Sequence, residues 1–137
     1  MTAGVTAVLI ALVVIQGALM AHEEGHTAPD QMPPFGPHGG NYTMLEKHYG
    51  EIVVRGGKIT VYILEKDLTF VAEDATGVTL AYEMKGSAKK TVKLAKKGDG
   101  YTANLSLPKT ARRVTFHISC VLDGKKESGS VIYEPGR

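Results

Sequence analysis

The chain has 137 residues, of which 43% are hydrophobic and 22% are charged, enough for one globular domain with a single core. A formal net charge of +2 is too small to indicate a nucleic-acid-binding protein, and the paired lysines fall near expected turns instead of forming a basic patch. The single cysteine, Cys120, excludes an intrachain disulfide and a thiolate zinc site.

The first segment, residues 1–21, contains no charged side chain and is long enough to form an apolar helix across a membrane core. It is either a signal peptide cleaved after Ala21 or an uncleaved N-terminal anchor. Gln16 and Gly17 interrupt the apolar run before Ala21, which favours the signal peptide. We therefore expect a periplasmic or otherwise exported protein, which is membrane-anchored only if this segment is retained.

Residues 22–40 are rich in histidine, proline and glycine. This composition forbids a long helix or strand and predicts a linker. From residue 41 onward short β-rich runs alternate with turns of Gly, Asp and Lys, so we expect a folded domain over residues 41–137. The expected strands are 42–48, 51–55, 58–65, 69–73, 78–85, 90–96, 101–107, 113–122 and 129–134.

Within these runs, apolar and polar residues alternate most clearly in 58–65 and 113–122, as in strands with one buried face. Strands of this kind predict an all-β fold, an antiparallel immunoglobulin-like β-sandwich of about 7–9 strands. An eight-stranded barrel is the alternative. The glycine pair in residues 55–58 predicts a two-residue hairpin turn. Cys120 lies on the apolar face of its strand, so we expect it to be buried.

Imidazole and thioether groups gather in the linker and just after it. They belong to His22, His26, His38, His48 and Met44. Neutral imidazole is a common metal ligand, and a thioether suits Cu(I). If residues 1–21 are removed, the α-amino group and ring of His22 can chelate Cu(II) together, with His26 or His38 completing a tetragonal set. These five residues are therefore candidate ligands for copper or another divalent transition metal. A solvated linker whose histidines bind nothing is the alternative.

No catalytic motif accompanies these histidines. The serines lie in turns or on polar strand faces without a nucleophile elbow, and the sequence has no phosphate-binding glycine loop or zinc-protease helix. His117 shares the polar face of its strand with Thr115 and Ser119, which is typical of a surface residue. We therefore do not expect an enzyme.

The segment FGPHGGNYTMLEKHYGEIVVRGGKITVYILEKD, residues 35–67, resembles the N-terminal domain of periplasmic adaptors from heavy-metal RND efflux pumps. The matching positions are His38, Gly39, Gly40, Glu51, Val61, Tyr62, Ile63 and Asp67. Residues 98–119, GDGYTANLSLPKTARRVTFHIS, are similar to the end of small immunoglobulin-like periplasmic domains associated with copper handling. The resemblance implies an exported β-sandwich linked to heavy-metal resistance. The chain lacks the coiled-coil hairpin and lipoyl-like halves of a complete adaptor.

Two functions follow from these observations. The first is a periplasmic metal-binding protein, a chaperone or scavenger, with a metal ion and a heavy-metal efflux assembly as its expected partners. It requires two or more of the candidate ligands to converge within about 4–5 Å around an ion. The second is a non-catalytic exported module without a metal site that binds a larger assembly. It predicts scattered histidines and an exposed apolar patch or open edge strand.

Overall fold

The structure is a computed structural model that describes residues 32–69 and 71–135. The predicted N-terminal helix over residues 1–21 lies outside the described residues, as do His22 and His26. Among the described residues, no helix is long and apolar enough to cross a membrane.

The β-structure belongs to the unit Pro34–Arg137, so the last residues of the predicted linker are part of the folded unit. Its described residues contain no helix, which confirms the all-β prediction for this part of the chain. The strands are β1 (Asn41–Met44), β2 (Tyr49–Arg55), β3 (Lys58–Leu64), β4 (Thr76–Met84), β5 (Lys90–Val92), β6 (Ala95–Lys97), β7 (Gly100–Asn104), β8 (Val114–Leu122) and β9 (Lys125–Tyr133).

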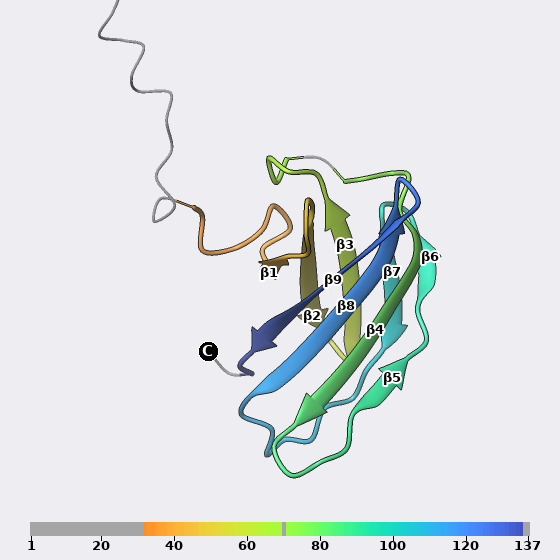
Figure 1. The fold of residues 1–137 in the computed structure, drawn as a ribbon. Helices are drawn as coiled ribbons and strands as arrows, with labels where there is room; N and C mark the ends of the chain where they lie inside the picture. The colour runs from red at the N-terminus through yellow and green to blue at the C-terminus, as the bar shows by residue number, and fades with distance from the viewer. Residues whose placement is uncertain (1–31, 70, 136–137) are drawn as a thin grey trace, which may run out of the picture. The chain divides into compact units, whose positions relative to one another are not determined.

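These strands form two antiparallel sheets, which we call sheet A, in the order β1-β2-β3-β7-β6, and sheet B, in the order β5-β4-β8-β9. Figure 1 shows sheet B in front of sheet A. β1 lies beside β9, and the short link from β5 to β6 passes from one sheet to the other. The architecture is a β-sandwich, as predicted, and the strand pairing does not form a single closed barrel.

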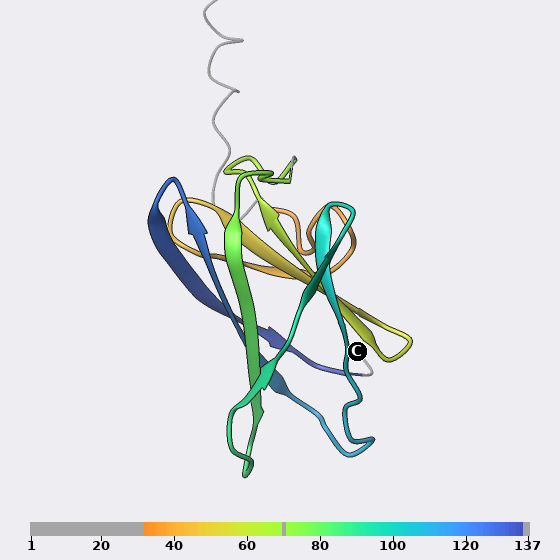
Figure 2. The same cartoon turned by 90° about the vertical axis from the view of Figure 1, so that its right-hand side faces the viewer.

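The connections matter for the site because several of them meet at one end of the sandwich. The connection between β3 and β4 and the turn between β6 and β7 lie at the upper end in both Figure 1 and Figure 2. The end of the β3–β4 connection closest to β4 is anchored by the buried Ala72 and Ala75. Loops carried on such a rigid framework are common places for binding residues.

The core lies between the two sheets. Its most deeply buried side chains include Ile52, Ile59, Val61, Ile63, Leu80, Val114, Phe116, Ile118, Cys120 and Leu122. The predicted apolar faces of 58–65 and 113–122 are therefore confirmed, and Cys120 is buried with 1% of its surface exposed.

The hairpin predicted at residues 55–58 is also confirmed. Arg55 pairs with Lys58, and the two residues between them, Gly56 and Gly57, have φ angles of 55° and 77°. Two successive positive φ angles suit the right-handed twist of the strands that the turn joins. Glycine adopts them without the steric penalty of a side chain.

The predicted strand at 69–73 is wrong. The structure has a turn and loop there, with Val71 making only an isolated bridge to the end of β3. Leu68 has a φ of 65°, and the N–H of Thr69 donates to Asp67 Oδ1 at 3.0 Å. This local side-chain-to-backbone bond bends the chain at residues 67–69, where the predicted strand begins.

Other predicted strands differ in length or in pairing, and the strand predicted at 101–107 ends at Asn104. The predicted strand 42–48 ends at Met44, because residues 45–48 form a turn in which the Leu45 N–H donates to the His48 carbonyl at 2.8 Å. The predicted strand 90–96 is divided into β5 and β6, which pair in different sheets. Alternation of residues cannot reveal that a strand changes partners midway.

Candidate functional site

Two histidines of the folded unit each lie against a buried carboxylate. His38 contacts Glu51, which is 0% exposed, and His48 contacts Glu127, which is 5% exposed. Burial of an ionised carboxylate is costly unless hydrogen bonds replace its lost water. Both glutamates therefore require several donors, and the chain supplies them from backbone N–H groups and imidazole rings.

Glu51 lies on the outward face of β2 and is covered by the turn formed by residues 36–40. Its Oε2 accepts the backbone N–H groups of His38 and Gly40, each at 2.9 Å. Its Oε1 lies 2.8 Å from His38 Nδ1. Because an ionised carboxylate only accepts hydrogen bonds, Nδ1 carries the proton in this contact, and a neutral ring has its lone pair at Nε2.

The glycines of the turn permit this close approach. A Cβ on Gly40 would lie 2.0 Å from the Ile52 carbonyl oxygen, and one on Gly36 would lie 2.5 Å from the carboxyl carbon of Glu51. Gly39 has a φ of 82°. The His-Gly-Gly pattern therefore has a direct structural role, because it lets the backbone of the turn enclose the carboxylate.

The imidazole of His38 is held in place on a second side. Its ring stacks on Tyr62 with centroids 3.6 Å apart and an interplanar angle of 2°, and Tyr62 is the cross-strand neighbour of Glu51. The His38 side chain is 33% exposed. No hydrogen bond or ion pair with residues of the described ranges engages its Nε2. The ring is oriented, and its second nitrogen is available.

His38 lines a surface hollow of about 300 Å³ at the end of the sandwich where the loops meet. The β3–β4 connection contributes Thr69, Val71 and Glu73 to this hollow, and the β6–β7 turn contributes Asp99. Glu73 and Asp99 are exposed, so the hollow combines an imidazole with two carboxylates. No three His, Cys, Asp or Glu side chains of the described part form a group that could hold a metal ion. A metal at His38 would need ligands from elsewhere in the chain.

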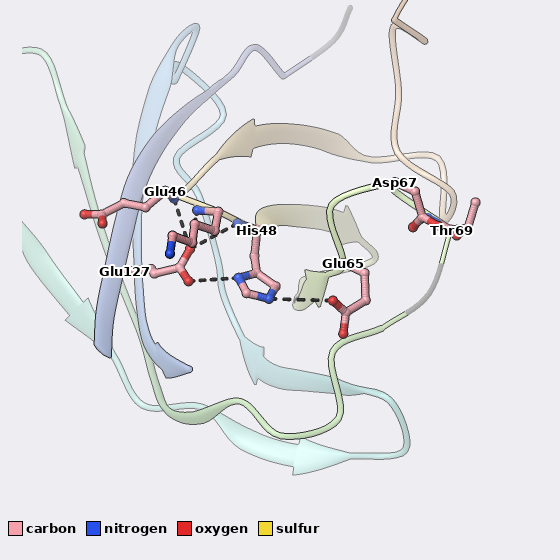
Figure 3. A network of polar contacts seen from close by, with 7 residues as sticks. Glu46, His48, Glu65, Asp67, Thr69 and Glu127 are labelled. Atoms are coloured by element: carbon pink, nitrogen blue, oxygen red, sulfur yellow. Dashed lines mark hydrogen bonds and ion pairs between the residues drawn. The ribbon is translucent and has the colours of Figure 1, made fainter. Parts of the chain in front are cut away.

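His48 has different surroundings, shown in Figure 3. Glu127 Oε1 accepts the backbone N–H groups of residues 46–48 at 3.1, 2.8 and 3.1 Å, and its Oε2 lies 2.8 Å from His48 Nδ1. His48 Nε2 faces Glu65 Oε2 at 3.6 Å. Burial raises the pKa of Glu127, but these hydrogen bonds together lower it by more. The pKa therefore lies below its ordinary value.

The three predicted ligands within the described residues thus have separate surroundings. Both ring nitrogens of His48 face carboxylates and the residue is 8% exposed, which is the environment of a residue that joins parts of the fold. Met44 is 56% exposed on β1. Of these three residues, His38 combines a ring held by stacking with a place in the lining of a polar hollow.

Sequence reasoning did not identify the carboxylates that orient the two histidines. Glu51 begins the predicted strand 51–55, and its charge directly before the apolar run Ile52–Val54 was the available signal. Glu127 follows a turn and carries no comparable signal. The chain matches no protein-family model, no curated protein and no solved structure, so the functional argument rests on the geometry of its own residues.

Proposed function

We propose that this protein binds a divalent transition metal ion, copper or a similar one, and that His38 is the ligand supplied by the folded unit. The observation that carries this proposal is the contact of His38 Nδ1 with the buried Glu51 carboxylate at 2.8 Å. Histidines that bind metals usually donate their other ring N–H to a carboxylate or carbonyl, which fixes the tautomer and makes the free nitrogen more basic.

Three further features support His38 as a ligand. Stacking on Tyr62 restricts the rotation of the ring, so less side-chain entropy is lost when an ion binds. The side chain is partly exposed. The carboxylates of Glu73 and Asp99 line the same hollow and give it a negative charge that attracts cations.

The other two imidazoles that the sequence offers as candidates lie outside the described residues. His22 and His26 precede the turn at residues 36–40 in the chain, and imidazole suits copper, nickel and zinc. We further propose, from the resemblance to efflux adaptor domains, that the protein acts in the periplasm as a metal chaperone or scavenger.

The test is a calorimetric titration of the protein from His22 onward with Cu(II), Ni(II) and Zn(II). We expect one site with sub-micromolar affinity. His38→Ala should weaken binding by at least about tenfold, which is the lower end of the loss in affinity when a hydrogen-bond partner of a metal ligand is removed. His117→Ala is the matched control, because His117 also contacts a carboxylate, Glu83 at 2.7 Å, on the other sheet. Absence of binding, or equal affinity in all three proteins, would overturn the proposal.

We also propose that the sandwich is of the immunoglobulin type. In that fold strands A-B-E-D form one sheet, and strands C, F and G form the other, with an additional C′ in variable-type domains. The order β2-β3-β7-β6 corresponds to A-B-E-D, and β5-β4-β8-β9 corresponds to C′-C-F-G. This correspondence supports the immunoglobulin-like assignment of the fold.

The second candidate function is that of an interaction module, in which the same sandwich binds a larger protein assembly. Its supporting observation is the exposure of large apolar side chains in the described residues, with Phe35 at 55%, Met44 at 56% and Ile132 at 42%. Met44 and Ile132 belong to β1 and β9, which lie side by side. The same titration separates the two functions, because a folded protein that binds none of the three metals would retain only this second candidate.

A further inference from the structure

A second hollow, of about 550 Å³, lies on the outer face of sheet B, the face toward the viewer in Figure 1. Its floor includes small residues of the outer face, among them Ala81, Ser119 and Ser130. These positions alternate along their strands with residues of the buried core. A register shift between Thr76 and Thr79 in β4 indicates a bulge, which increases the local twist of a sheet.

The fully ionised side chains that line the hollow are all positively charged. Lys89 and Lys126 line it, and no described residue that lines it is Asp or Glu. Neither lysine forms an ion pair with another residue of the described part. An ammonium group has three donors and no acceptor, so the hollow presents two unneutralised positive charges.

Hydroxyl groups complete this set. Thr79, Thr91, Ser119 and Ser128 line the same hollow. A hydroxyl donates readily to an anionic oxygen, and hydrogen bonds to an ionised acceptor are about twice as strong as neutral ones. Ammonium and hydroxyl groups around one hollow are the complement of an oxyanion.

His117 lines the hollow from β8 and is held in place. Its Nε2 lies 2.7 Å from Glu83 Oε1 and its Nδ1 lies 2.8 Å from Ser130 Oγ. The carboxylate accepts, so in a neutral ring Nε2 is the donor and Nδ1 accepts from the Ser130 hydroxyl. Glu83 contacts His117 beside the hollow but is not among the residues that line it, and the two lysines outnumber this one carboxylate.

We propose that this hollow binds a small molecule bearing an oxyanion of two or more negative charges, either a phosphate ester or a multiply carboxylated acid. The size of the hollow is within the range of sites for small organic molecules, roughly 300–1,000 Å³, and exceeds what a single ion needs. The site is on sheet B and uses none of the residues around His38, so it is independent of the metal site.

The test is calorimetric titration of the metal-free protein with pyrophosphate and, separately, with citrate at low salt. We expect single-site binding that weakens as salt rises, because salt screens exposed charges. The double variant K89Q/K126Q should lose at least tenfold in affinity. The matched control is K96Q/K97Q, which removes the same charge from β6 in sheet A and should bind as the wild type does.

A third variant separates location from charge. Ser128→Leu fills the hollow at an exposed position without changing the net charge, and it should also lose at least tenfold in affinity while urea unfolding shows an intact fold. Binding of pyrophosphate alone assigns phosphate chemistry, binding of citrate alone assigns carboxylate chemistry, and binding of both supports the shared oxyanion. The proposal would be overturned by no binding to the wild type, or by equal losses in K89Q/K126Q and K96Q/K97Q.

Discussion

At the scale of single residues, Glu127 is a buried carboxylate whose two oxygens are both in hydrogen-bonding contacts. One of its oxygens accepts three backbone N–H groups, and the other contacts His48 Nδ1. Glu127→Gln replaces one acceptor oxygen by a donor and removes the charge. We expect the free energy of unfolding to fall by about 2 kcal/mol, since hydrogen bonds to charged groups contribute about 1.5–3 kcal/mol. Urea unfolding of the two proteins measures this difference.

Glu46→Gln is the control for this substitution. Glu46 is exposed and takes part in the contact only through its backbone N–H, which the substitution retains. Its free energy of unfolding should stay within about 0.5 kcal/mol of the wild type, as is usual for a surface position. Equal stability of Glu127→Gln and Glu46→Gln would show that the carboxylate does not hold the turn.

Cys120 gives a second prediction at this scale. Burial, together with the charge of its cross-strand neighbour Glu127, raises the pKa of its thiol to about 11. The thiolate is the reactive form, and the side chain is 1% exposed. The native protein should therefore not react with a disulfide reagent such as DTNB near neutral pH, and one thiol should react in urea. Rapid labelling of the native protein would contradict the burial of Cys120.

At the scale of elements, the turn over residues 36–40 depends on a position that has no room for a side chain. A Cβ on Gly40 would meet the Ile52 carbonyl oxygen at 2.0 Å, and a backbone group in a paired strand cannot move aside cheaply. Gly40→Ala should displace the turn from Glu51 and lower the free energy of unfolding by about 2–3 kcal/mol, the upper part of the range of about 1–3 kcal/mol for an overpacked site. Amide hydrogen exchange at His38 and residue 40 should become faster as well.

Gly56→Ala provides the comparison for Gly40→Ala. A Cβ on Gly56 meets nothing within 4 Å, and the only cost is its φ of 55°, about 1 kcal/mol for a residue with a side chain. The two substitutions therefore separate steric exclusion from backbone strain. A Gly40→Ala protein as stable as Gly56→Ala would mean that the turn does not pack closely on β2.

Elements whose cause is local were predictable from the sequence. The buried face of β8 follows from alternation, and the turn at residues 55–58 follows from its two glycines. The end of β1 was not predictable, because the Glu127 side chain that organises the following turn is 80 residues from Lys47 in the chain. The same holds for the hollow at His38, whose carboxylates Glu73 and Asp99 come from separate loops. Candidate ligands could be named from the sequence, but their neighbours could not.

At the scale of the whole molecule, the His48–Glu127 contact joins the two sheets. Glu127 belongs to β9 of sheet B, and the turn that it holds connects the first two strands of sheet A. A Cβ on Gly129, two residues further along β9, would lie 2.7 Å from the Met44 carbonyl oxygen. The backbones of β1 and β9 therefore approach closely along one side of the sandwich, and the charge of Glu127 affects the stability of both sheets.

This link predicts how the stability of the protein depends on pH. The pKa of Glu127 in the folded protein is lowered from its ordinary value of 4.5, so above pH 4.5 the carboxylate is ionised whether the chain is folded or unfolded, and its contribution to stability is complete. As the pH falls below 4.5 towards the folded pKa, the unfolded chain binds the proton first, and this contribution is lost. Glu127→Gln has no such proton to bind. Urea unfolding from about pH 7 to about pH 3 should show the wild type and Glu127→Gln converging in stability below 4.5, and a constant difference between them would contradict the lowered pKa.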